Sequence, residues 1–181
     1  MEVTGTQTIP GVLQEQARLQ PDKEFIVFEG ADGQVTTLNY RAFTERVTQL
    51  ANALIDDGVR AGQTVALMVS TCPEFLISWL AINQAGAVMV PVNVFYAADE
   101  LQYLLNNSDS VGFISEPRFI GLFNEVAAVC PGVCVRISTR IGTGTDGFRL
   151  LPDILASASS DCRMVAVAPR SEEHTSELQS R

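Results

Sequence analysis

The chain has 181 residues, of which 46% are apolar and 18% are charged, a balance typical of a folded globular domain with its own core. The formal net charge is −9 without any long basic block, which argues against nucleic acid as a partner. No apolar run reaches the length of a transmembrane segment, and the N-terminus lacks the pattern of a signal peptide, so we expect a cytoplasmic protein.

The beginning of the chain predicts a helix, a hairpin and a longer helix. Two extended stretches, 25–28 and 34–38, flank an Asp-Gly turn signal, which indicates an antiparallel hairpin. Asn39 is suited to cap a helix that runs to about Asp57, where Gly58 ends it. A short helix is expected before the hairpin at 9–19, and the residues expected on its packed side are Val12, Leu13, Ala17 and Leu19.

After this beginning, apolar strands alternate with helices. Strands are expected at 64–69, 88–92, 111–115 and 133–138, and helices at 73–85, 99–106, 119–129 and 152–158. Strands that are apolar throughout indicate parallel pairing, buried on both faces by right-handed helical crossovers. We therefore predict an α/β fold, with an N-terminal hairpin followed by βαβ units and a mostly parallel sheet. The expected core consists of Phe43, Val47, Leu50, Leu54, Val65, Leu67, Trp79, Leu80, Val88, Val90 and Pro91.

Two motifs point to chemistry that their context does not support. Gly142, Gly144 and Gly147 match the glycine pattern of a dinucleotide-binding turn, but no helix follows directly, and we expect a surface loop instead. His174, the single histidine, could act as a general base beside two glutamates, yet a solvated tail is the favoured interpretation. The pair Cys130 and Cys134 has no second pair of ligands, so we assign no metal site.

The segment after the strand at 88–92 is the best candidate for a ligand pocket. Open α/β sheets bind ligands beyond the carboxyl ends of their strands. Asn93, Phe95 and Tyr96 lie just past such an end, and we predict that they form the rim of a substrate pocket. Phe75 and Trp79, which lie one helical turn apart, could also line an apolar pocket, but packing against the sheet is the favoured interpretation.

Two ordered motifs resemble one enzyme family. The run from Thr36 to Ser110 is similar to the N-terminal region of the AMP-forming acyl-CoA synthetases, members of the adenylate-forming superfamily. Within it, 38–43 (LNYRAF) resembles the first core motif of the family and 80–93, with Gln-Ala-Gly-Ala and Val-Pro-Val-Asn, resembles the second. Asn39, Phe43, Gln84 and Ala97 depart from the family pattern, and the loss of a hydroxyl at Ala97 is expected to weaken the start of the next helix.

The resemblance implies a ligase that uses ATP, Mg²⁺ and coenzyme A. Such an enzyme activates a carboxylic acid, here expected to be a fatty acid, as an acyl adenylate and then transfers the acyl group to coenzyme A. The family's phosphate loop, its Mg²⁺-binding glutamate and its mobile C-terminal domain do not occur in this sequence, so we assign no catalytic, cofactor-binding or metal-binding residue and expect the isolated chain to be inactive. Two alternatives stay open: an adenylation domain that loads an amino or aryl acid onto a carrier protein, and a short non-catalytic α/β binding module.

The resemblance also divides the chain. Residues 1–169 are expected to be the N-terminal part of an AMP-binding domain, which stops before the phosphate loop. Arg170 to Ser180 resembles the translation of a sequencing-library adapter, so we expect residues 170–181 to be an artefactual tail. Sheet edges and apolar faces left uncovered by this division are expected to make the isolated chain self-associate.

Overall fold

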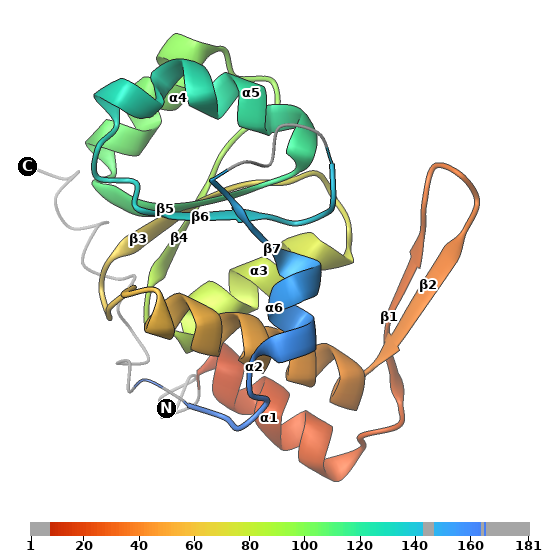
Figure 1. Cartoon of the computed structure of the whole chain (residues 1–181). Coiled ribbons are helices and arrows are strands. Elements are labelled where there is room, and N and C mark those ends of the chain that lie inside the picture. Colours follow the sequence, from red (N-terminus) through yellow and green to blue (C-terminus); the bar gives the residue numbers. More distant parts are fainter. Residues whose placement is uncertain (1–7, 143–146, 164, 166–181) are drawn as a thin grey trace, which may run out of the picture.

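The computed structural model describes residues 8–142, 147–163 and 165. Its elements in chain order are α1 (Ile9–Leu19), β1 (Glu24–Glu29), β2 (Val35–Asn39), α2 (Tyr40–Asp56), β3 (Thr64–Met68), α3 (Pro73–Gln84), β4 (Val88–Pro91), α4 (Ala98–Asn107), β5 (Ser110–Ser115), α5 (Pro117–Val126), the 3-10 turn η1 (Ala127–Val129), β6 (Val135–Ser138), β7 (Arg149–Leu150) and α6 (Leu151–Ser157). Strands β1 and β2 form an antiparallel hairpin, and the other five form a parallel sheet in the order β4-β3-β5-β6-β7 (Figure 1). The predicted α/β fold is confirmed.

Helix α2 is defined at both ends by its own sequence. At its start, the Asn39 side chain accepts a hydrogen bond from the Ala42 amide at 2.8 Å, as the sequence predicted. At its end, Gly58 adopts φ +98°, and the Val59 amide donates to the Leu54 carbonyl at 2.9 Å. This pattern is a Schellman motif, which a left-handed glycine allows at little cost.

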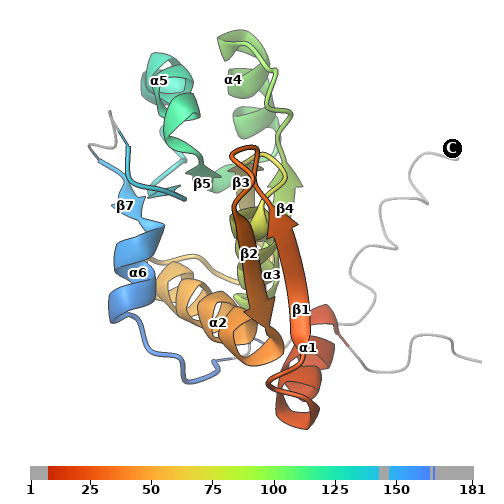
Figure 2. The same cartoon turned by 90° about the vertical axis from the view of Figure 1, so that its right-hand side faces the viewer.

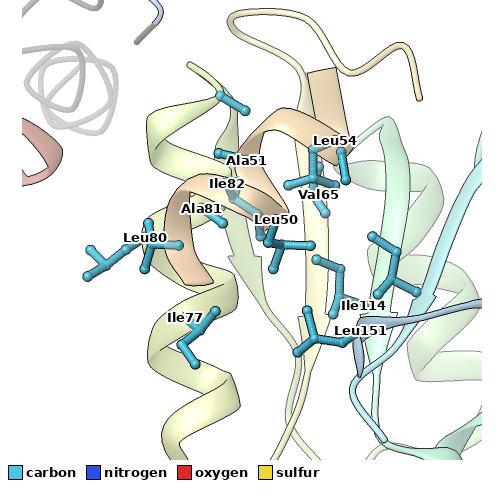
Figure 3. Close-up of a cluster of buried hydrophobic side chains, with 14 of the residues drawn as sticks. Leu50, Ala51, Leu54, Val65, Ile77, Leu80, Ala81, Ile82, Ile114 and Leu151 are labelled. Atoms are coloured by element: carbon cyan, nitrogen blue, oxygen red, sulfur yellow. The ribbon is translucent and has the colours of Figure 1, made fainter. Parts of the chain in front are cut away.

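The parallel sheet separates two helical layers. Helices α1, α2, α3 and α6 lie on one face, and α4 and α5 lie on the other (Figures 1 and 2). The alternation of side chains along β3 follows this division, because Val65 and Leu67 pack with α2 and α3 whereas Ala66 and Met68 pack with α4 and α5. Figure 3 shows the first of these two cores, in which Leu50 and Leu54 of α2 lie close to Val65.

The hairpin projects from the helical layer beside the N-terminal end of α2 (Figure 1). Its base is fixed by aromatic packing, since the ring of Phe25 stacks on Tyr40 with centroids 4.4 Å apart and meets Phe43 edge-on. Farther from this base, Val27 and Val35 are exposed. The hairpin is therefore anchored at one end and open at the other.

Several expectations about burial are wrong. Strand β4 was expected to be buried, but it lies at the edge of the sheet, with Val88 51% exposed and Pro91 also exposed. Val90 and Trp79, both expected in the core, are half-buried. On α1, Leu13 is buried as expected, whereas Val12 and Leu19 are exposed. An apolar sequence does not distinguish a central strand from an edge strand, because that depends on later strand pairing.

After α6 the chain returns across the outer side of α2. Asn52, which is 2% exposed, donates to the carbonyls of Ser159 and Asp161 at 2.8 and 2.9 Å. The Gln49 side chain donates to Leu155 and Ala158 carbonyls in the same way. These side-chain amides donate hydrogen bonds to backbone carbonyls at the end of α6 and after it, so they fix the path of the returning segment. None of the described helices combines the length and apolarity needed to cross a lipid bilayer.

Candidate functional site

The carboxyl edge of the parallel sheet is where this fold gathers polar side chains. The chain passes from β3 to the outer strand β4 and then back to β5 on the other side of β3. This reversal places a crossover between the carboxyl ends of β3 and β5, which is the usual ligand position in open parallel sheets. The loops that follow β3, β4, β5 and β6 all emerge at this edge.

The predicted rim residues lie in the loop after β4. Asn93 organises this loop: its side chain accepts from the Phe95 amide at 3.0 Å, and its carbonyl accepts from the Tyr96 amide at 3.1 Å. Phe95 points into solvent with 89% of its surface exposed. Tyr96 lines a shallow groove of about 570 Å³ with Val90 and Tyr103. Tyr96 lines this groove, whereas Asn93 and Phe95 do not, and the role of the three residues as a pocket rim stays a prediction.

A charged cluster at the ends of β3 and β5 was missed by the sequence analysis. The carboxylate of Glu116 accepts from the Ser70 amide at 2.6 Å and pairs with Arg118 at 3.3 Å. Arg118 also donates to the Ser70 hydroxyl. Burial alone would raise the pKa of Glu116, but the hydrogen bonds from Ser70 and the charge of Arg118 outweigh it and lower that pKa. Glu116 is therefore a carboxylate held by converging donors.

A second cluster follows β3 and β6. The Glu74 carboxylate pairs with Arg140 at 3.2 Å, and the thiol of Cys72 lies beside Glu74. Burial, the hydrogen bond to Glu74 and the charge of Glu74 raise the pKa of Cys72 to about 11. Burial acts to raise the pKa of Glu74, but hydrogen bonds from Cys72 and Arg140 lower it overall. Cys72 is consequently a protonated thiol at neutral pH rather than a nucleophile.

Buried hydroxyls complete this edge. Ser138 donates to the Arg140 carbonyl at 2.8 Å, which fixes the loop after β6. Ser115 and Thr139 have fully buried hydroxyl oxygens without hydrogen-bond partners in the described part of the chain. The signal in the sequence was a polar residue at the end of an apolar strand, repeated at Ser70, Ser115 and Ser138. The strand order was needed to show that these ends are adjacent.

Two of the three glycines of the glycine motif, Gly142 and Gly147, are described and lie between β6 and β7. Gly142 packs closely on Pro117, where a Cβ atom would lie 2.5 Å from the proline Cβ. Gly147 adopts φ +81° two residues before the start of β7, a strand that the sequence analysis did not predict. The expected surface connection is therefore consistent with the position of these two glycines, whereas Gly144 and His174 lie outside the described residues.

The described residues of this edge offer hydrogen-bond donors and positive charge. Two arginines, amide groups and hydroxyls can hold anionic or hydrogen-bonding groups. In the described ranges, no group of three or more histidine, cysteine or acidic side chains has a geometry suited to a metal ion. Cys130 is buried and Cys134 is exposed, and both are free thiols.

Comparisons with known proteins agree on one family. The model of the AMP-binding enzyme family matches residues 13–169. Crotonobetaine/carnitine–CoA ligases of Salmonella typhimurium (strain LT2) and Salmonella enteritidis PT4 are 29% identical to this chain over 126 residues, which are 70% of this chain and 24% of each relative. The chain thus spans about a quarter of the length of the curated relatives it matches.

Solved structures share the fold. The anthranilate CoA ligase AuaEII in complex with anthranoyl-AMP superposes with a TM-score of 0.81 at 20% identity, over 92% of this chain and 31% of that protein. A protein of Rhodopseudomonas palustris CGA009 assigned as a long-chain-fatty-acid CoA ligase gives a TM-score of 0.74 at 28% identity, over 90% and 39% of the two chains. Because the family model covers nearly the whole described structure, the chain belongs to the AMP-binding enzyme family.

Proposed function

We propose that this chain is the N-terminal part of an adenylate-forming ligase that joins a carboxylic acid to coenzyme A. The observation that carries this proposal is that the two Salmonella relatives at 29% identity and the Rhodopseudomonas palustris protein at 28% identity are described as CoA ligases. In the whole protein, ATP would activate the acid as an acyl adenylate with release of pyrophosphate, and coenzyme A would then displace AMP. Mg²⁺ would screen the phosphate charges that repel the attacking carboxylate.

The described residues supply scaffold to this reaction. The carboxyl edge of the sheet offers arginines and hydroxyls. The thiol of Cys72 also lies there, but burial and Glu74 raise its pKa to about 11, so it is protonated at neutral pH. Among the described residues the single lysine, Lys23, is exposed and precedes the hairpin. We therefore propose that the groups that bind the phosphates of ATP and the metal ion of the reaction belong to the three quarters of the relatives' length that this chain does not span.

The acid is proposed to be a fatty acid. The Rhodopseudomonas palustris protein, at 28% identity, is described as acting on long-chain fatty acids, and the Salmonella relatives are described as acting on crotonobetaine and carnitine. The predicted rim formed by Asn93, Phe95 and Tyr96 would then face the apolar part of the substrate. No observation favours transfer to a carrier protein or a non-catalytic binding module over this proposal.

An assay of carboxylate-dependent pyrophosphate release tests the proposal. The purified 181-residue chain, given ATP, Mg²⁺ and a panel of short, long and aromatic acids, should release no pyrophosphate above background. A longer protein that carries this segment should release pyrophosphate with its preferred acid and form a thioester when coenzyme A is added. Turnover by the 181-residue chain would refute the proposal that the phosphate-binding groups lie outside it. A longer protein that releases no pyrophosphate in response to any acid would refute the proposed ligase activity.

A further inference from the structure

The crossover between β3 and β5 is the position at which an open parallel sheet is best able to bind an anion. The loops after both strands lead directly into helices, α3 and α5, whose N-terminal amides carry partial positive charge. In this chain the loop after β3 supplies the amide and hydroxyl of Ser70, and the first turn of α5 supplies the guanidinium of Arg118. Three kinds of donor therefore converge on one point.

That point is occupied by a side chain of the protein itself. One oxygen of Glu116 accepts from the Ser70 amide at 2.6 Å, and the other pairs with the Arg118 guanidinium at 3.3 Å. Glu116 is 8% exposed although it is a charged residue at the N-terminal end of a helix. A buried carboxylate is costly unless donors surround it, and here they do.

Electrostatics at the crossover favour a negative charge. The hydrogen bonds from Ser70 and the charge of Arg118 hold the pKa of Glu116 below its usual range in spite of burial. The pKa of Arg140 is raised, first by its hydrogen bond to Glu74 and also by the negative charges of Glu74 and Glu116, so this second guanidinium interacts electrostatically with Glu116. Arg118 and Arg140 keep about half of their side-chain surfaces exposed.

A carboxylate and a phosphate group require the same donors. Backbone amides near helix N-termini, a hydroxyl and an arginine fork are the groups that bind phosphate in many proteins. The alternative interpretation is that Glu116 only fastens the loop after β3 to α5, as an ordinary ion pair does. The two interpretations differ in what remains when the carboxylate is removed: a competent anion site in the first case and a collapsed loop in the second.

We propose that the β3–β5 crossover is an anion site of the phosphate class, which the chain closes with the carboxylate of Glu116. The donors are the Ser70 amide and hydroxyl and the Arg118 guanidinium. The site does not depend on the ligase activity proposed above, because it is built from described residues of this chain alone.

Titration of the full chain with inorganic phosphate, followed by calorimetry, tests this proposal. The wild-type protein should show no saturable binding, since Glu116 fills the site. Glu116→Ala should show saturable phosphate binding, with an affinity at least about tenfold above the upper limit that the titration sets for the wild type, the amount expected from one charge-assisted hydrogen bond. Adding Arg118→Ala to that variant should abolish the gain.

Two control variants separate the site from general charge effects. Glu125→Ala removes one negative charge from an exposed position on the same helix and should bind no phosphate. Glu116→Asp keeps the carboxylate and should stay closed. If circular dichroism shows that Glu116→Ala is unfolded, Glu116→Gln, which removes only the charge, replaces it with a smaller expected gain. A folded variant without gained binding, or a gain that survives the loss of Arg118, would overturn the proposal.

Discussion

Two glycines end helices in this structure with the same backbone geometry but different surroundings. Gly58 follows α2 at φ +98° and Gly86 follows α3 at φ +77°, and in both cases the next amide closes a Schellman motif. An added Cβ at Gly58 would meet nothing within 4 Å. At Gly86 it would lie 2.8 Å from the Val165 side chain and 3.2 Å from Ala61.

We expect Gly86→Ala to destabilise the chain more than Gly58→Ala does. Gly58→Ala costs only the left-handed conformation, roughly 1–2 kcal/mol. Gly86→Ala adds an overpacking cost of about 1–3 kcal/mol, because Val165 and the returning segment must shift. Urea unfolding of both variants gives the two free energies of unfolding. Equal losses would mean that the contact with Val165 contributes nothing to stability.

The residues of the candidate site could be predicted from sequence only in part. Asn93 could be singled out because it follows an apolar strand; its side chain accepts a hydrogen bond from the Phe95 amide, and its role at a pocket rim stays a prediction. Glu116 and Ser70 could not, because they are 46 positions apart and come together only through the pairing of β3 with β5. Strand ends identify candidate residues, whereas strand order decides which of them meet.

Helix α4 begins with only half of the usual cap. Ala97 occupies the N-cap position in an extended conformation and has no side-chain oxygen to accept an amide hydrogen bond. The reciprocal half is present, since the Glu100 carboxylate accepts from the Ala97 amide at 2.9 Å. The weak start that the sequence predicted is thus partly offset by Glu100.

We expect Ala97→Ser to stabilise the chain by about 1 kcal/mol, because the new hydroxyl can accept from the Glu100 amide and complete the capping box. Ala98→Ser is the matched control: it places the same hydroxyl one residue inside the helix, where serine is slightly unfavourable. Thermal unfolding of both variants compares the two positions. A shift of the same sign and size in both would show that capping is not the cause.

The sequence predicted an element most accurately where residues typical of helix ends stand on both sides of it. Helix α2, with Asn39 before it and Gly58 after it, was placed within a residue. Strand β7 was missed because it has two residues and follows a glycine-rich segment, where the apolar pattern is too short to indicate a strand. Local signals define helices better than they define short strands, which depend on a neighbour such as β6.

At the scale of the molecule, the order of the strands determines which surfaces stay open. The sequence predicted parallel βαβ units but not that β4, although apolar, would lie outermost. Pairing of β5 with β3 forces this order, because it leaves β4 with one neighbour among the described strands. The same pairing brings Ser70 to Glu116 and so creates the candidate site.

The open edge of β4 gives a prediction for the isolated chain, which we expect to self-associate as its concentration rises. Among the described strands β4 pairs only with β3, and Val88 on it is 51% exposed, a combination that invites pairing with a second chain. Val88→Lys should lower the average mass in light scattering after gel filtration, because a charge opposes edge pairing. Val129→Lys, at an equally exposed valine in η1, should leave it unchanged. A wild-type chain that stays monomeric at every concentration would contradict this prediction.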